Sequence, residues 1–153
     1  MSDARNYGID AATGKYLGFI DGDDYIEPEM YEKLYNALVD NNADISICKF
    51  RYLGAKEDRN DNIAITDEVL TGKEILFEKR AAKNAWGWGF AWNKLYKKEV
   101  FRELRYPVGK AYEDDFIVHK LFWDVQRVAC TSYIGYNYIE RNKYNKFIQN
   151  KCS

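Results

Sequence analysis

The chain has 153 residues, of which 46% are hydrophobic and 31% are charged, an ordinary balance for one globular domain. Its formal net charge of −1 gives no general attraction to nucleic acid, so we expect no nucleic-acid partner. The sequence contains no apolar run long enough to cross a bilayer. Its three cysteines form no CxxC pair, which favours a reducing, cytoplasmic compartment.

The hydrophobic pattern predicts helices alternating with strands, which is typical of an α/β or α+β fold. The expected helices cover residues 4–12, 28–39, 71–79, 97–104 and 113–125. The expected strands cover residues 16–20, 44–52 and 93–96, and a strand or hairpin covers 128–138. Thr71 followed by Glu74 is a capping box, which marks a helix start. In the helix over 113–125, one side should face the core and carries Phe116, Ile117, Leu121 and Phe122.

Three carboxylates, Asp21, Asp23 and Asp24, directly follow the first expected strand. Carboxylates this close repel one another unless a cation lies between them, and Mg²⁺ and Mn²⁺ prefer such oxygens. Because Asp-Gly is also a common turn dipeptide, a solvated turn remains an equal alternative. An EF-hand loop is excluded, because Ile26 occupies the position that requires glycine and Pro28 interrupts the loop.

The segment over residues 4–24, Ala-Arg-Asn-x-Gly-Ile-x-x-Ala-x-Gly-x-Tyr-x-x-Phe-x-Asp-x-Asp-Asp, resembles the middle of family-two, GT-A type glycosyltransferases. The later segments Trp-Asn-Lys-Leu-Tyr-Lys at 92–97 and Glu-Asp-Asp-Phe at 113–116 resemble the second half of the same domain. The resemblance implies a partial GT-A domain over residues 1–140, a mixed sheet flanked by helices, followed by a basic, aromatic tail over 141–153.

The resemblance also implies a metal-dependent, inverting transfer of a sugar from a nucleotide diphosphate to a hydroxyl of a saccharide or other acceptor. Asp21 and Asp23 match the acids that hold Mn²⁺ or Mg²⁺ against the donor diphosphate, with Asp23 as the direct ligand. Such a cation offsets the charge of the departing diphosphate. Asp24 is a weaker candidate, and Asp21 and Arg5 are expected on the substrate-binding side.

By the same resemblance, Asp114 is the candidate catalytic base, with Glu113 beside it. A base that takes the acceptor proton contributes about 10²–10⁴-fold to the rate. The alternative is that residues 113–115 simply complement the positive end of a helix.

Aromatic residues alternate along residues 86–92, at Trp86, Trp88, Phe90 and Trp92. In an extended chain all four rings would lie on one face. This face could be a wall on which sugars stack or a stripe of the core, and Trp92 is the candidate for the acceptor site. His119 is a weak candidate for an additional metal ligand, since a single histidine on a helix is more often solvated or packed.

Family members begin with two strands that recognise the nucleotide, and neither is recognisable in this chain. We therefore expect a C-terminal part of the domain, impaired alone, that forms a homo-oligomer or binds a complementing N-terminal half. The basic tail suggests weak contact with an anionic membrane face, which would make the chain peripheral at the inner face of the membrane. A non-catalytic remnant that serves as an oligomeric binding module is the alternative.

Overall fold

The computed structural model describes residues 1–54, 64–81 and 87–140. These residues form one mixed, six-stranded sheet in the order β1-β5-β3-β6-β2, with β4 paired to β6. The strands are β1 (Tyr16–Gly18), β2 (Tyr25–Ile26), β3 (Ile45–Leu53), β4 (Glu68–Leu70), β5 (Lys94–Lys97) and β6 (Val128–Ile139). The helices are α1 (Ser2–Ala11), α2 (Met30–Asp40), α3 (Gly72–Glu74), the π-helix η2 (Ile75–Lys79), the 3₁₀-helix η3 (Lys98–Phe101) and α4 (Glu113–Trp123).

The long strand β6 organises the sheet. It pairs in parallel with β3 along its whole length and antiparallel with β4 and β2. The register with β3 shifts between Cys48 and Phe50, so β6 is one irregular strand and not a hairpin. Its C-terminal end pairs Asn137 with Tyr25 in β2, which brings the residues that follow β1 beside β6.

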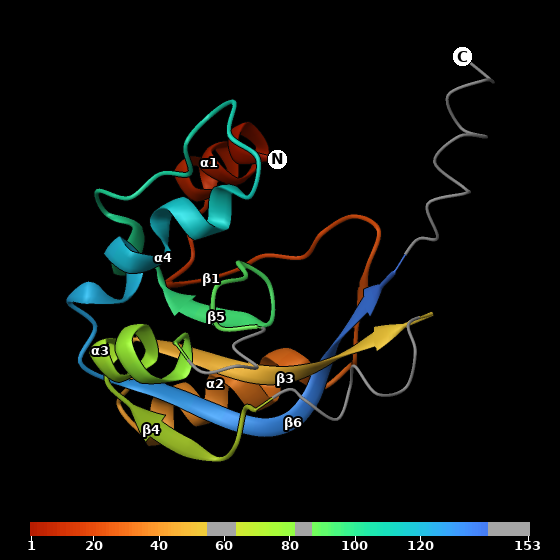
Figure 1. The fold of residues 1–153 in the computed structure, drawn as a ribbon, viewed down its shortest axis with the longest axis vertical. Helices are drawn as coiled ribbons and strands as arrows, with labels where there is room; N and C mark the ends of the chain where they lie inside the picture. Colours follow the sequence, from red (N-terminus) through yellow and green to blue (C-terminus); the bar gives the residue numbers. More distant parts are fainter. Residues whose placement is uncertain (55–63, 82–86, 141–153) are drawn as a thin grey trace.

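The helices lie at different places around the sheet, and two groups of them bear on the site (Figure 1). Helix α2 covers β3 and β6, and its buried side chains Met30, Leu34 and Leu38 recur at the spacing of one helix face. Helices α1 and α4 lie together beyond the end of the sheet formed by β1 and β5. The second group brings the N-terminal residues next to the start of α4, where the acids at 113–115 lie.

The expected fold class is confirmed, with local differences. The capping box of Thr71 and Glu74 is present, although the helix that it starts continues as a π-helix. The helix expected over 97–104 is only the single turn of η3. Phe116 is exposed and Val118 is buried in its place. The strands β2 and β4 were not predicted, because two or three residues carry too little alternation to be recognised.

Candidate functional site

The three acids after β1 form a tight turn. The backbone N–H of Asp24 donates to the carbonyl of Asp21 at 3.1 Å. The carboxylate of Asp24 accepts from the Tyr136 hydroxyl at 2.8 Å and from the Ile139 N–H at 2.9 Å. Burial raises the pKa of Asp24 despite these two hydrogen bonds. Both of its oxygens therefore bind β6 and hold the turn against it, while Asp23 is an exposed residue of the turn.

Tyr136 on β6 holds the turn at a second point. Its hydroxyl accepts the backbone N–H of Asp21 at 3.1 Å while donating to Asp24. Its ring stacks on Trp92, with the ring centroids 4.3 Å apart. The acidic turn and the aromatic side chains near it are thus parts of one packed unit.

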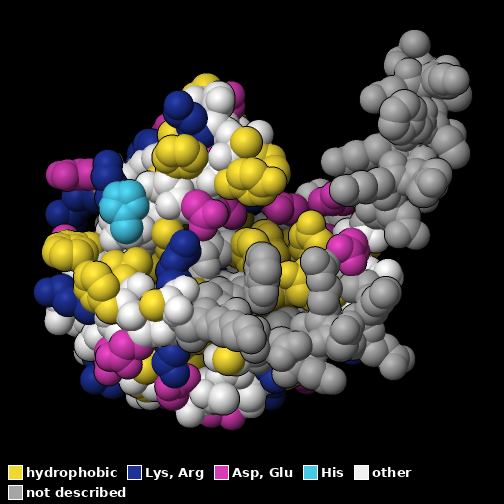
Figure 2. Space-filling model, viewed as in Figure 1, with side chains coloured by type: hydrophobic (Ala, Val, Ile, Leu, Met, Phe, Trp, Pro, Cys, Tyr) yellow, Lys and Arg dark blue, Asp and Glu magenta, His cyan; other side chains and the backbone are white. Residues whose placement is uncertain are grey.

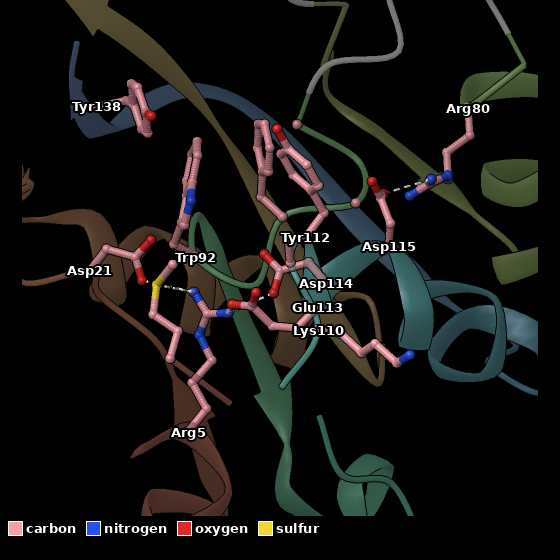
Figure 3. Close-up of a pocket in the computed structure, with 15 residues that line it drawn as sticks. Arg5, Asp21, Arg80, Trp92, Lys110, Tyr112, Glu113, Asp114, Asp115 and Tyr138 are labelled. Carbon is pink, nitrogen blue, oxygen red and sulfur yellow. Dashed lines mark hydrogen bonds and ion pairs between the residues drawn. The ribbon is translucent and has the colours of Figure 1, made fainter. Parts of the chain in front are cut away.

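Arg5 on α1 joins the turn to the start of α4 (Figure 3). Its guanidinium donates to Asp21 at 2.8 Å, to Glu113 at 2.5 Å and to Asp114 at 2.6 Å. The guanidinium also lies 5.3 Å from the centre of the Tyr106 ring. Burial alone would lower the pKa of Arg5, but the Asp114 and Asp21 carboxylates raise it above its ordinary value. A single fixed cation therefore offsets the repulsion among three buried or half-buried carboxylates.

Asn6 on α1 fixes the position of the loop that contains Tyr106. Its amide donates to the Tyr106 carbonyl, and its carbonyl accepts the Tyr106 N–H, both at 2.8 Å. The neighbouring pair of Arg5 and Asn6 therefore places Tyr106 below the guanidinium and the acids of α4 beside it.

Asp114 lies where α4 meets the aromatic segment over 87–92. One of its oxygens binds Arg5, and the other accepts the backbone N–H of Ala91 at 3.1 Å. Burial raises the pKa of Asp114, although Arg5 and the Ala91 N–H favour its charged form. The preceding Tyr112 has left-handed backbone angles, φ 57° and ψ 45°, and its side chain is exposed. This turn directs both Glu113 and Asp114 toward Arg5.

These groups line a cleft of about 740 Å³. Asp21, Glu113 and Asp114 lie around Arg5, Trp92 and Tyr138 lie on one side, and Arg80, paired with Asp115, lies across from them (Figure 3). Lys110 and Tyr112 come from the loop before α4. Figure 2 shows acidic side chains gathered across the middle of this face, directly beside hydrophobic ones. The cleft thus combines carboxylates, cations and aromatic rings.

The aromatic segment differs from the extended arrangement. Gly87 has a φ of 97° and Asn93 a φ of 42°, so residues 87–93 bend and the extended chain that one common face requires is not formed there. Trp88 is buried in the core, whereas Phe90 and Trp92 stack at 4.4 Å and line the cleft. Trp88 therefore belongs to the core, whereas Phe90 and Trp92 line the cleft. Trp92 itself is only 3% exposed. Trp86 lies outside the described residues.

The carboxylates of the acidic turn suit a cation that takes most of its ligands from substrate phosphates and water. No group of three or more His, Cys, Asp or Glu side chains that could hold a metal occurs in residues 1–54, 64–81 and 87–140. Mg²⁺ is commonly bound through one or two carboxylates together with substrate phosphates and water. Asp21 and Asp23 fit that requirement. His119 lines a different cavity, of about 590 Å³, and does not line the cleft.

Comparison with known proteins identifies the family. The sequence model for Glycosyl transferase family 2 matches residues 1–105. The chain belongs to this family. Glycosyltransferase GlyA of Streptococcus pneumoniae is 32% identical over 136 residues, which cover 80% of this chain and 18% of GlyA. The uncharacterized glycosyltransferase EpsJ of Bacillus subtilis is 36% identical over 105 residues, which cover 66% of this chain and 30% of EpsJ.

Solved structures share the fold of this chain. Residues 1–349 of S. aureus TarS, in complex with UDP-GlcNAc, superpose with a TM-score of 0.75 at 18% identity. The match covers 93% of this chain and 39% of that chain. The chain likewise spans 18% to 42% of the length of the first curated relatives that it matches. None of the described helices is long and apolar enough to span a membrane.

The structure thus brings Arg5, Asp21, Glu113, Asp114 and Trp92 to one cleft, with Asp23 on the adjoining turn. Sequence reasoning missed further cleft residues and supports of the site, namely Arg80, Lys94, Lys110, Tyr112 and Tyr136. Lys94 could have been noticed, since it lies within the recognised segment 92–97. The loop residues Lys110 and Tyr112 carry no periodic pattern that would have marked them.

We expect replacement of Arg5 by methionine to destabilise the protein by about 3–5 kcal/mol at neutral pH, because three carboxylates lose their shared cation. The loss should shrink as the pH falls. Without the guanidinium the folded-state pKa of Asp114 rises further above its unfolded value, so protonation then favours the folded state. Urea unfolding at about pH 7 and pH 5 measures both effects.

Arg102→Met is the control, since Arg102 is an exposed arginine outside this cleft. It should change the unfolding free energy by less than about 0.5 kcal/mol at either pH. A pH-independent loss in Arg5→Met would contradict the role assigned to its charge.

Proposed function

We propose that this domain takes part in metal-dependent, inverting transfer of a sugar from a nucleotide diphosphate to a hydroxyl acceptor. The observation that carries the proposal is the meeting of Asp21 with Glu113 and Asp114 on one guanidinium at an open cleft. These acids are remote in sequence, and Arg5 lies 16 positions from Asp21 and 109 from Asp114. Family membership supports glycosyl transfer as the chemistry.

In this proposal Asp23 and Asp21 hold Mn²⁺ or Mg²⁺ beside the donor diphosphate. The exposed position of Asp23 suits a direct ligand, and the turn is fixed to β6 through Asp24 and Tyr136. A cation bound there would offset the negative charge of the departing diphosphate. The UDP-GlcNAc complex of the TarS fragment makes a uridine nucleotide sugar a reasonable first donor to test.

Asp114 is proposed as the base that takes the proton of the attacking hydroxyl. A carboxylate with a raised pKa is a stronger base, which suits this task, and its bonds to Arg5 and the Ala91 N–H fix its orientation. Glu113 accepts a hydrogen bond from the Arg5 guanidinium and so helps to hold it in place. Phe90 and Tyr138 supply aromatic surface on which the acceptor sugar can pack. Trp92, which is stacked between Phe90 and Tyr136, supports that surface from within the protein.

The chain spans 18% to 42% of the length of its first curated relatives, and in this proposal the complete activity needs more polypeptide than these residues. We propose that the nucleotide base is recognised by a complementing N-terminal half and that this chain alone is impaired. The proposed location is cytoplasmic, with weak peripheral contact at the membrane through residues 141–153, which lie outside the described residues. The division of the chain at residue 140 likewise remains a proposal.

The partial coverage of the relatives favours one alternative, a non-catalytic, oligomeric binding module derived from a glycosyltransferase. Such a module would retain the fold and the Arg5 network but would bind neither the cation nor the donor. The two functions therefore differ in nucleotide binding, which can be measured without any turnover.

Calorimetric titration with UDP and Mn²⁺ should give metal-dependent binding with a dissociation constant of about 1 mM or lower. Asp23→Ala should abolish that binding, because the cation loses its proposed protein ligand. Asp40→Ala replaces an exposed acid at the end of α2 and should leave binding unchanged. Absence of binding in an intact fold would favour the non-catalytic module.

Sugar transfer by the isolated chain should be very weak or undetectable. Any residual transfer should fall by about 10²–10⁴-fold in Asp114→Asn, which removes the proposed base. The matched control is Asp124→Asn, since Asp124 is an exposed acid at the other end of α4 and does not line the cleft. Consumption of UDP-GlcNAc measures the rate. Robust turnover by the chain alone would show that the proposed N-terminal half is not needed.

We also expect a dimer or larger oligomer. Within the described residues β1 ends the sheet and pairs only with β5, so it presents one open edge. Sedimentation equilibrium measures the assembly state over a range of protein concentrations. A monomer at the highest concentration would contradict this expectation.

A further inference from the structure

Lys94 is a charged side chain that the proposed mechanism does not use. It lies in β5, is 0% exposed, and points into the protein beneath the aromatic segment. Its ammonium donates to the Gly87 carbonyl at 2.8 Å, the Phe90 carbonyl at 2.7 Å and the Asn93 side-chain oxygen at 2.8 Å. An ammonium has three donors, so these three acceptors satisfy it completely.

Burying this charge is costly, and a core position alone would be filled better by an apolar side chain. Burial lowers the pKa of Lys94 to about 7, although the nearby Asp114 carboxylate acts in the opposite direction. Cys48, Cys130 and Arg80 also face it. No described carboxylate forms an ion pair with Lys94, so the ammonium is held by oxygens of the segment over 87–93.

The three acceptors close that segment around the ammonium. The segment contains two residues with positive φ, Gly87 at 97° and Asn93 at 42°. None of its residues belongs to a helix or a strand. Asn93 is tied to β3, because its side-chain amide donates to the Cys48 carbonyl at 2.8 Å. The ammonium therefore anchors a backbone that lacks a hydrogen-bond ladder of its own.

The anchored segment contacts the proposed base. Phe90, whose carbonyl binds Lys94, immediately precedes Ala91, whose N–H donates to Asp114 at 3.1 Å. The carbonyl of Ala91 accepts the Tyr96 hydroxyl at 2.9 Å, which fixes the next peptide unit along the chain. The chain of contacts runs from the ammonium through one peptide unit to the carboxylate.

We propose that Lys94 is a positioning residue, whose ammonium shapes the segment over 87–93 so that the Ala91 N–H orients Asp114 and Phe90 lines the cleft. The importance of Asp114 for transfer rests on the proposed function, but the positioning itself does not. A test that reads the state of Asp114 directly therefore separates failure of this inference from failure of the proposed function.

The test is Lys94→Met, which keeps the length of the side chain and removes its charge, followed by NMR of the folded protein. The carboxyl carbon of Asp114 should titrate at higher pH than in the wild type, because the Ala91 N–H and the nearby ammonium both favour the charged carboxylate. Hydrogen exchange of the Ala91 amide should accelerate by about tenfold or more as its hydrogen bond weakens.

Lys97→Met is the matched control. Lys97 lies in the same strand but is partly exposed, and it pairs with Asp44 outside the cleft. It should leave the Asp114 titration and the Ala91 exchange unchanged. A Lys94→Met variant that folds and also leaves both readouts unchanged would overturn the inference.

If Lys94→Met does not fold, a pH titration of the wild-type protein by NMR tests the inference instead. As the pH rises from about 6 to 9, loss of the Lys94 charge should move the amide shifts of Phe90 and Ala91 together with the Lys94 side-chain carbon signal. Amide shifts that stay constant while the Lys94 side-chain carbon signal titrates would overturn the positioning role.

Discussion

The candidate site depends on the shared guanidinium of Arg5. Carboxylates from the turn after β1 and from the start of α4 lie within hydrogen-bonding distance of it. Without a cation, carboxylates buried this closely would repel one another or take up protons. An arginine suits the position because it remains charged and its planar donors can serve several carboxylates at once. The docking of α1 beside α4 is thus also an electrostatic requirement of the cleft.

The three acids of the turn have different surroundings despite their similar sequence positions. Asp24 uses both oxygens to bind β6, Asp21 binds Arg5, and Asp23 is exposed. The turn expected from the Asp-Gly sequence is therefore present, whereas a cation site at these acids stays a prediction. The same turn leaves the carboxylate-bearing Asp23 exposed to solvent.

The sequence predicted the fold class and the main elements, because hydrophobic periodicity persists over long segments such as α2 and β6. The family resemblance located Asp21, Glu113 and Asp114, and the structure brings them together at Arg5. Local pattern could not predict the bend over residues 87–93. That bend depends on left-handed residues and on a buried ammonium, which are tertiary features.

The bond between Asp24 and Tyr136 has a consequence for synthesis of the chain. The two residues are separated by 112 positions, and the parallel pairing of β3 with β6 is similarly non-local. Contacts of this kind form late, because a long loop must close before they give any stabilisation. A ribosome-bound chain that ends before β6 therefore lacks the hydroxyl that holds the acidic turn. The cleft can mature only after nearly all of the described polypeptide has emerged, and until then the nascent chain exposes unpaired strand edges to aggregation and to chaperones.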